Sequence, residues 1–490
     1  MSTKRVLAFD FGASSGRAML GQVMDGRIVL DEIHRFANEP ITIDTTLHWD
    51  FNRLFDEIKT AMKIAKNSGG FDAISIDTWG VDFGLIGHDG NLLELPVHYR
   101  DERTVGIPEK LFELIDKKQL YMQSGIQIMR INTIFQLYSL KLNRSEFLNS
   151  AKTLLMVPDL LAYMLTGAIR SEYTEATTTG LINPDTHDWN WELIDLIGIN
   201  KDIFPPIIHS GDSYGLLSKE ICDDIGITQV PVIAVGCHDT ASAIAAVPAQ
   251  NDDFIYVSCG TWSLFGTLSK TPFINEKSYE YNLTNEGGVN KETTFLKNIM
   301  GLWLIQESRR QFKREGNDLS YAELEQLALE AEPFKSFINP NHESFESPGD
   351  LPSRIRDYCK DTNQPIPSTI GEIMRCVYES IALEYANSLM QISNVTVKEY
   401  DTIHIIGGGT KDEFLCQLAA NACGVKVVAG PIEATAIGNI STALIALGEI
   451  KDRNQARQMI SDNENVKTFL PQDSLNWEKA FGEYLSVINS

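Results

Sequence analysis

The chain has 490 residues, of which 43% are hydrophobic and 22% charged, a balance typical of a globular protein with a sizeable core. Acidic residues outnumber basic ones by 66 to 42, which gives a formal net charge of −24 at pH 7. Nucleic acids and anionic membranes need a basic surface, so this balance excludes both as main partners. The length is enough for about two to four domains.

The seven cysteines are scattered, and none lies at zinc-binding spacing. We expect them to be small buried side chains in a reducing compartment. The first residues, MSTKRVLAFDFG, lack the apolar stretch of a secretory signal, and no run approaches the ~20 apolar residues of a membrane span. The sequence therefore predicts a cytoplasmic protein.

The first predicted elements are three strands, a helix and a fourth strand. The apolar strand RVLAFDFG runs into the polar loop GASSGR, and two more strands follow at hairpin spacing. Leu54, Ile58 and Met62 lie at helical spacing in DFNRLFDEIKTAMKIAKNSGG, which predicts a helix. FDAISIDTWG is then a strand with a polar end, and residues 96–230 form mixed, mainly helical segments that elaborate this part.

A later stretch, FIYVSCGTWSLFGTL, resembles the opening stretch VLAFDFGASSGRAML. Each has a strand, a small polar turn and an apolar return, which favours two related α/β halves, with coincidence between two hairpins as the alternative. The seam is predicted at AVPAQNDD and divides the chain into residues 1–247 and 248–490. Two such lobes would leave a cleft between them, where ligands often bind.

Three glycine-rich turns could bind phosphate, although neither a GxxxxGK[ST] nor a GxGxxG motif occurs. In GASSGR, backbone amides, two serine hydroxyls and an arginine could face phosphate oxygens. SCGTWS contains Gly260 and Thr261 in a similar turn. In IIGGGTKDEF, three glycines precede a helix that Thr410 and Glu413 are predicted to cap. A plain turn between two elements is the alternative for each.

The best candidate for a catalytic base lies in VPVIAVGCHDTASAIAAV, a strand that ends at Gly236 before an Ala-rich helix. Ligands bind at strand ends in α/β folds. Asp239 could therefore accept a proton from a substrate hydroxyl as a phosphoryl group arrives. Helix capping by Asp239 or Thr240 is the alternative. His238 is interpreted as a structural histidine or a sugar contact rather than a base.

Two acids at the ends of predicted strands, Asp10 and Asp77, could hold Mg²⁺, which usually takes one or two carboxylates plus phosphate oxygens and waters. Turn formation is the alternative for both. Gly80, in the following TWG, fits a small polyol ligand or a bulge. Asn298 and Gln306 lie near two helical turns apart and could share one helix face, with buried structural amides as the alternative.

The motifs together resemble the FGGY sugar kinases, a family within the actin-like ATPase superfamily. In chain order, the motifs that carry this resemblance over nearly the whole chain are DFGASSGR, IDTWGVDF, YRDERT, SGIQ, EYTEATTTGLIN, HDTASA, SCGTWS, TNEGG, KNIMGLWLIQ, IIGGG and AGPIEATAIGNI. The Ala-Ser-Ser-Gly-Arg form of the first loop is similar to that of the rhamnulokinases within the family. The resemblance implies an α/β fold with two actin-like (ribonuclease H-like) lobes around a central catalytic cleft.

The resemblance also implies ATP- and Mg²⁺-dependent phosphorylation of the 1-hydroxyl of L-rhamnulose, in L-rhamnose catabolism and without an obligate protein partner. Asp239 would be the proton acceptor, and Asp10 stays the candidate for the metal. The residues implied to contact ATP are Ala13, Ser14, Ser15, Gly16, Arg17, Thr261, Gln306, Gly407, Gly408 and Gly409. Those implied to contact the sugar are Gly80, His238, Asp239, Thr240 and Asn298.

Two positions depart from the family pattern. Asp412 stands where relatives often have asparagine, which leaves the adenine-side contacts open, and Cys259 stands where they often have serine. The nearest alternative activities are those of a fuculokinase, a xylulokinase or a polyol kinase. An actin-like ATPase that acts on partner proteins and a sugar sensor without turnover are the alternatives from other classes.

Overall fold

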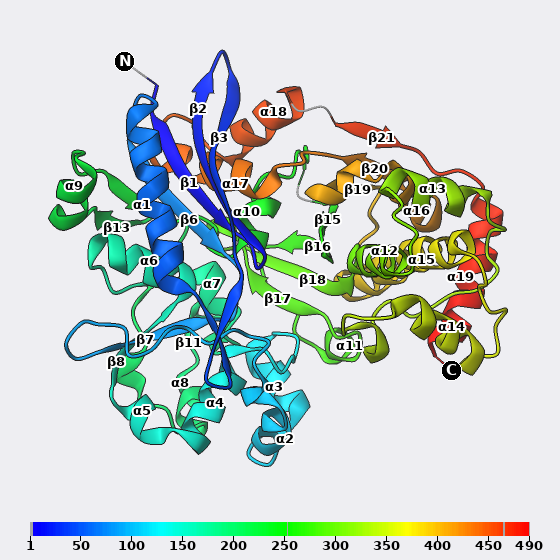
Figure 1. The fold of residues 1–490 in the computed structure, drawn as a ribbon, viewed down its shortest axis with the longest axis horizontal. Coiled ribbons are helices and arrows are strands. Elements are labelled where there is room, and N and C mark those ends of the chain that lie inside the picture. Colours follow the sequence, from blue (N-terminus) through cyan, green and yellow to red (C-terminus); the bar gives the residue numbers. More distant parts are fainter. Residues whose placement is uncertain (1–2, 252, 464–465, 490) are drawn as a thin grey trace. The chain divides into compact units, whose positions relative to one another are not determined.

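A computed structural model describes residues 3–251, 253–463 and 466–489 of the chain (Figure 1). Contacts divide the chain into two compact units, each built from several stretches of sequence. The boundary predicted between residues 247 and 248 is a single cut and stays a prediction. The first unit comprises Met1–Gln250, Leu268–Phe295 and Ala434–Asn463, and the second comprises Asn251–Thr267, Leu296–Glu433 and Glu464–Ser490.

The first unit is built on a six-stranded sheet with the strand order β13-β14-β6-β1-β2-β3. The central strand β1 is almost fully buried and pairs antiparallel with β2 and parallel with β6. This confirms the predicted strands, hairpins and polar strand end of the first ninety residues. The strands are β1 (Arg5–Phe11), β2 (Ser15–Met24), β3 (Arg27–Ala37), β6 (Ala73–Thr78), β13 (Ser213–Leu216) and β14 (Pro231–Ile233).

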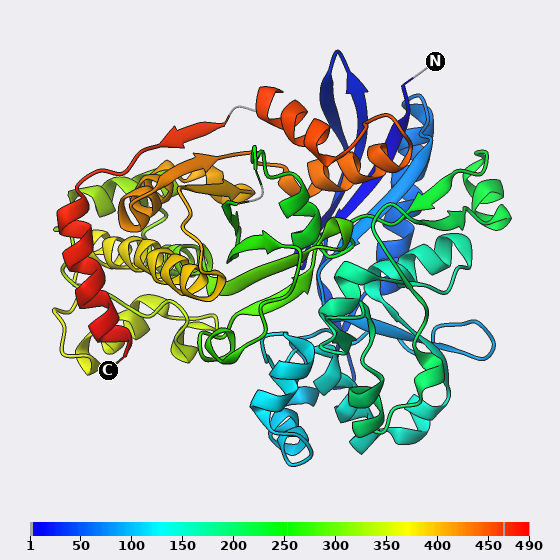
Figure 2. The ribbon, with the colours of Figure 1, turned by 180° about the vertical axis from the view of Figure 1, so that it is seen from behind.

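Helices pack on this sheet through apolar faces. The predicted helix forms as α1 (Phe51–Asn67), and Leu54, Ile58 and Met62 are buried in the core as their spacing predicts. Figure 2 shows α17 and α18, in orange tones, beside the blue strands of the sheet. The other helices around this sheet are α6 (Val157–Thr166), α9 (Lys219–Ile225), α10 (Asp239–Ala245), α17 (Ala434–Ala446) and α18 (Arg453–Asn463), of which α9 contacts α1.

A second apolar cluster of the first unit lies among short elements between residues 83 and 207. The mixed helical segments predicted there are present, together with short strand pairs. The helices are α2 (Ile107–Phe112), α3 (Lys117–Ser124), α4 (Thr133–Asn143), α5 (Ser145–Asn149), α7 (Tyr173–Thr177) and α8 (Trp191–Leu196). The strand pairs there are β7 (Phe83–Gly87) with β8 (Ala151–Met156), β9 (Ser171–Glu172) with β12 (Ile207–Ile208), and β10 (Ile182–Asn183) with β11 (Asp188–Trp189). A further pair, β4 (Pro40–Ile43) with β5 (Thr46–Trp49), precedes α1 in the chain.

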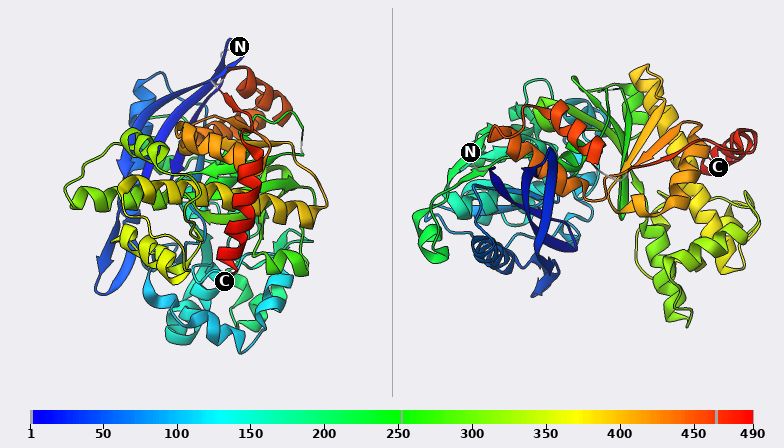
Figure 3. Two further views of the ribbon diagram at one scale, coloured as in Figure 1. Left: turned by 90° about the vertical axis from the view of Figure 1, so that its right-hand side faces the viewer. Right: turned by 90° about the horizontal axis from the view of Figure 1, so that it is seen from above.

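The second unit contains most of a seven-stranded sheet with the order β17-β18-β16-β15-β19-β20-β21. Its long helix α15 packs against the closing helix α19, coloured red in Figure 3. The strands are β15 (Ile255–Cys259), β16 (Trp262–Ser269), β17 (Thr284–Gly287), β18 (Thr293–Met300), β19 (Thr402–Ile406), β20 (Lys426–Ala429) and β21 (Lys467–Phe469). The helices of this part are α12 (Trp303–Arg314), α13 (Tyr321–Glu330), α14 (Leu351–Asp361), α15 (Ile370–Thr396), α16 (Glu413–Cys423) and α19 (Ser474–Ile488), and α11 (Glu276–Glu280) precedes β17.

The two sheets repeat one arrangement. In the first, the antiparallel hairpin β1–β2 is extended by the parallel strand β6, and in the second the hairpin β15–β16 is extended by the parallel strand β19. This agrees with the similarity between the two hairpin sequences. All seven cysteines are free thiols, six of them buried. Within the described ranges, no helix is both long and apolar enough to cross a membrane.

Candidate active site

Two aspartates lie side by side at the ends of β1 and β6. Asp10 is the register partner of Asp77 in the parallel pairing of these strands. Asp10 accepts hydrogen bonds from Arg17 Nε (2.9 Å) and Nη2 (2.8 Å), which balances its charge. Asp77 is fully buried, and Asn439 Nδ2 of α17 donates to its Oδ2 at 2.5 Å. Burial and the charge of Asp10 raise the pKa of Asp77 well above its ordinary value.

The first glycine-rich turn, GASSGR, is the hairpin loop between β1 and β2. Two hydrogen bonds from Asn38 hold its shape. The Asn38 side chain donates to the Gly12 carbonyl (2.9 Å), and the Asn38 backbone N–H donates to the Ser14 carbonyl (3.0 Å). Ala13 and Ser14 are exposed, and no described group hydrogen-bonds to the Ser14 or Ser15 hydroxyl. The turn is therefore both the plain hairpin of the alternative interpretation and a loop with free hydroxyls.

Arg17, which is expected to add charge for a phosphate, also binds an acid of its own hairpin. Its guanidinium group is already bound to Asp10, and the two residues are register partners across β1 and β2. Close packing explains the glycine at position 16, because a Cβ there would lie 2.4 Å from the Phe36 ring. Arg17 thus orients Asp10 in this structure.

Asp239 is the first residue of α10, and His238 precedes it as the N-cap residue. The N-cap residue His238 makes no side-chain capping hydrogen bond. The Asp239 side chain is 33% exposed, and the Thr240 hydroxyl donates to its Oδ1 at 3.2 Å. Burial of the carboxyl group and, second, the charge of Asp10 raise the pKa of Asp239 to about 7.

His238 lies between two carboxyl groups. Its Nε2 is 3.6 Å from Asp239 Oδ1, and its Nδ1 is 3.5 Å from Glu286 Oε2. Burial lowers the pKa of His238, and the charge of Glu286 opposes that shift. A Cβ on Gly80 would lie 2.9 Å from Thr178 Cγ2 and 3.3 Å from His238 Nε2, so four of the first unit's candidates for the sugar site lie close together: Gly80, His238, Asp239 and Thr240.

The second unit brings together two of the glycine-rich turns. Thr261 is exposed between β15 and β16, and its carbonyl accepts from Trp303 N (3.1 Å) at the start of α12, the helix that carries Gln306. Gly409 packs directly on β15, because a Cβ there would lie 2.2 Å from Cys259 Sγ. Gly407 has a φ of 83°, which favours glycine. The Gly407–Gly409 turn and the Thr261 turn therefore flank the end of one strand.

Two predictions about this unit are wrong. Thr410 does not cap α16, because its hydroxyl donates to the Gly407 carbonyl within the turn, and Asp412 is the cap that accepts from Leu415 N at 2.9 Å. Asn298 and Gln306 do not share a helix face. Asn298 lies in the strand β18 and Gln306 in α12, and a spacing of eight residues fits one face of a strand as well as one face of a helix.

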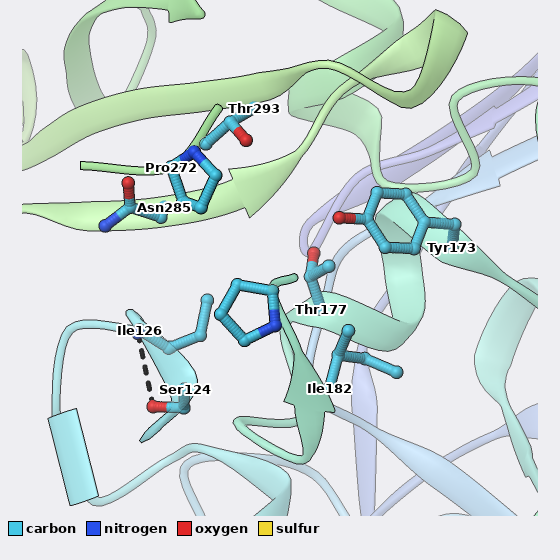
Figure 4. A pocket seen from close by; sticks show the side chains of 9 residues that line it. Ser124, Ile126, Tyr173, Thr177, Ile182, Pro272, Asn285 and Thr293 are labelled. Atoms are coloured by element: carbon cyan, nitrogen blue, oxygen red, sulfur yellow. Dashed lines mark hydrogen bonds between the residues drawn. The ribbon is translucent and has the colours of Figure 1, made fainter. Parts of the chain in front are cut away.

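A pocket in the first unit contains none of the predicted site residues (Figure 4). Figure 4 shows Tyr173 and Thr177 of α7 facing it across from Asn285 and Thr293. It gives no separate support to the sugar site. The functional candidates that sequence reasoning missed are instead Glu286 and Asn439, which lie in the TNEGG and AGPIEATAIGNI motifs but had no role assigned.

Comparison with known proteins gives matches along the whole chain. Residues 5–246 match the N-terminal domain model of the FGGY family of carbohydrate kinases, and residues 255–447 match its C-terminal domain model. A rhamnulokinase of Bacteroides thetaiotaomicron is 42% identical over 482 residues, covering 98% of this chain and 99% of the relative. A rhamnulokinase of Bacillus subtilis is 39% identical, with 95% of each chain covered.

Solved structures support the fold. A ligand-bound xylulose kinase from Lactobacillus acidophilus matches with a TM-score of 0.83 at 19% identity, covering 99% of this chain and 98% of that one. A glycerol kinase from Plasmodium falciparum with ADP matches with a TM-score of 0.80 at 15% identity, covering 99% and 98%. The predicted α/β fold with two actin-like lobes is confirmed.

Proposed function

The chain belongs to the FGGY family of carbohydrate kinases, and from this premise we propose that it phosphorylates the 1-hydroxyl of L-rhamnulose with ATP. It is an enzyme that phosphorylates sugars, so the sugar sensor and the partner-directed ATPase are set aside. The choice of L-rhamnulose is carried by one observation, the nearly full-length similarity to relatives that are named rhamnulokinase.

Asp239 is the proposed general base. The 1-hydroxyl oxygen attacks the γ-phosphorus, its proton passes to an Asp239 carboxylate oxygen, and the bond from the γ-phosphorus to the bridging oxygen breaks to release ADP. A base works best when its pKa lies near the operating pH, and the pKa of about 7 meets that condition. Gly80, His238, Thr240 and Asn298 are the other proposed sugar contacts.

Asp10 and Asp77 fit a divalent cation. Asp77 Oδ1 is buried without a hydrogen-bond partner among the described residues, and Asp10 and Asp77 are neighbours in register on two parallel strands. We propose that this pair holds Mg²⁺, which when bound would neutralise charge on the phosphates. The proposed ATP contacts are residues 13–17 in the first unit and Thr261, Gln306 and Gly407–Gly409 in the second.

Sugar-dependent release of ADP from MgATP tests the proposed function directly. We expect release with L-rhamnulose and little with L-fuculose, D-xylulose or glycerol, because the sugar must be held in line with the γ-phosphorus for transfer. Proton-coupled ³¹P NMR of the product should place the phosphate on carbon 1. Selectivity for another acceptor would overturn the substrate, and no sugar-dependent ADP would overturn the kinase reaction.

The proposed base also predicts a pH dependence. With both substrates below saturation, kcat/KM should rise with pH through about 7 and then level off, because the base must be deprotonated to accept the proton. Activity is thus lost as the pH falls below this pKa. The measurement is kcat/KM from pH 5.5 to 9 at fixed ionic strength. A flat profile between pH 6 and 8 would contradict Asp239 as the titrating base.

A further inference from the structure

The loop that ends at Asp239 is hydrogen-bonded to a segment that lies far away in the sequence. The Oγ1 of Thr174, in α7, accepts a hydrogen bond from the backbone N–H of His238 at 3.1 Å. Glu172, just before α7, accepts one from the backbone N–H of Cys237 at 3.3 Å. On the other side, Thr78 N of β6 donates to the Cys237 carbonyl at 2.8 Å. The two residues before Asp239 are therefore fixed between β6 and α7, which Figure 1 labels.

Glu172 and Thr174 are fully buried and bound to each other. The Thr174 hydroxyl donates to Glu172 Oε2 at 2.5 Å, and Thr174 N donates to the same oxygen at 2.9 Å. Ser210 Oγ donates to Glu172 Oε1 at 3.2 Å. A buried network in which the groups are satisfied is rigid, and a missing member leaves an unpaired polar group in a dry environment.

Thr174 differs from the three threonines that follow it. Thr177, Thr178 and Thr179 each donate a hydroxyl to the backbone carbonyl three residues earlier, so their donors serve their own segment. Thr174 instead donates to a side chain and accepts from the loop of the proposed base. Thr177 and Thr178 also accept from distant backbone N–H groups, those of Gly287 and Val81. What sets Thr174 apart is that its distant partner is His238, the residue before the proposed base.

We propose that Thr174, held by Glu172, is a positioning residue for Asp239. It fixes the backbone of residues 237–238 and thereby the direction in which the Asp239 carboxylate points. Displacement by about 1 Å in a reacting geometry costs on the order of 100-fold in rate, so this support bears on turnover. The inference rests on the proposed function, in which Asp239 is the base.

The test compares two buried threonines that make equivalent hydrogen bonds. Thr174→Val removes the acceptor for His238 N and should lower kcat by about 100-fold. Thr179→Val is the matched control, because Thr179 is also fully buried, donates to a carbonyl and accepts from the backbone N–H of Leu181. It should lower the melting temperature to a similar extent and leave kcat near that of the wild type. Thr174→Ser keeps the hydroxyl and should restore kcat.

Hydrogen exchange provides a readout that does not depend on activity. The amides of Cys237 and His238 should exchange faster in Thr174→Val and at the wild-type rate in Thr179→Val. Unchanged exchange, an unchanged kcat in Thr174→Val, or an equal loss of kcat in both valine variants would overturn the positioning role. If the wild type released no sugar-dependent ADP while the exchange pattern held, the proposed function would fail and the support of this loop would stand.

Discussion

The Asp239→Asn variant is expected to keep its fold and to lose turnover by about 10²–10⁴-fold, the range that a general base contributes. Asparagine has the shape of aspartate but cannot take the proton of the sugar hydroxyl. The Thr240 hydroxyl can still donate to the amide oxygen, so the start of α10 is kept. The measurement is kcat with saturating MgATP and sugar, beside a thermal melt.

A matched control separates the base from a helix cap. Asp116 caps α3 by accepting from Lys118 N and Gln119 N, and asparagine is also a good cap, so Asp116→Asn should keep full activity. If Asp239→Asn turned over at a rate near that of the wild type, the assignment of Asp239 as base would be wrong. Equal losses in both variants would point to a general effect of these substitutions on the fold.

Local pattern was enough to predict the elements that carry the site. The apolar run before Asp10 could be assigned to a strand, and the spacing of Leu54, Ile58 and Met62 to a helix, because burial on one face imposes these periods. The turns at GASSGR, SCGTWS and GGG were recognised from their glycines and lie where the strands end. Such patterns involve residues that are close together in the chain, so they can be recognised from the sequence alone.

The partners of the site residues could not be predicted, because they come from distant segments. Asn439 donates to Asp77 across 362 positions, and Thr174 accepts from His238 across 64. The residue types alone do not indicate these partners, because an amide or a hydroxyl side chain in a helix usually contacts solvent or the nearby backbone. Asn298 was misplaced because a spacing of eight residues does not distinguish a strand from a helix. These partners are set by tertiary contacts between segments that are far apart in the chain.

The Gly438→Ala variant is expected to lose stability by about 3 kcal/mol, the upper end of the range usual for overpacking a core. Gly438 lies in α17 where this helix crosses α10, and a Cβ there would lie 1.7 Å from the backbone oxygen of Ser242. A backbone oxygen cannot swing aside as a flexible side chain can, so the two helices must separate. The separation would disturb both Asp239, at the start of α10, and Asn439, which holds Asp77.

Gly482→Ala is the control for a glycine in a helix without a close neighbour. Gly482 is exposed in α19, and a Cβ there would meet nothing within 4 Å. Alanine forms helices more readily than glycine, so this variant should gain up to about 1 kcal/mol. The two substitutions are chemically identical and should shift the melting temperature in opposite directions. A melting temperature of Gly438→Ala equal to that of the wild type would show that α10 and α17 do not approach as closely as described, because no other change is made at that contact.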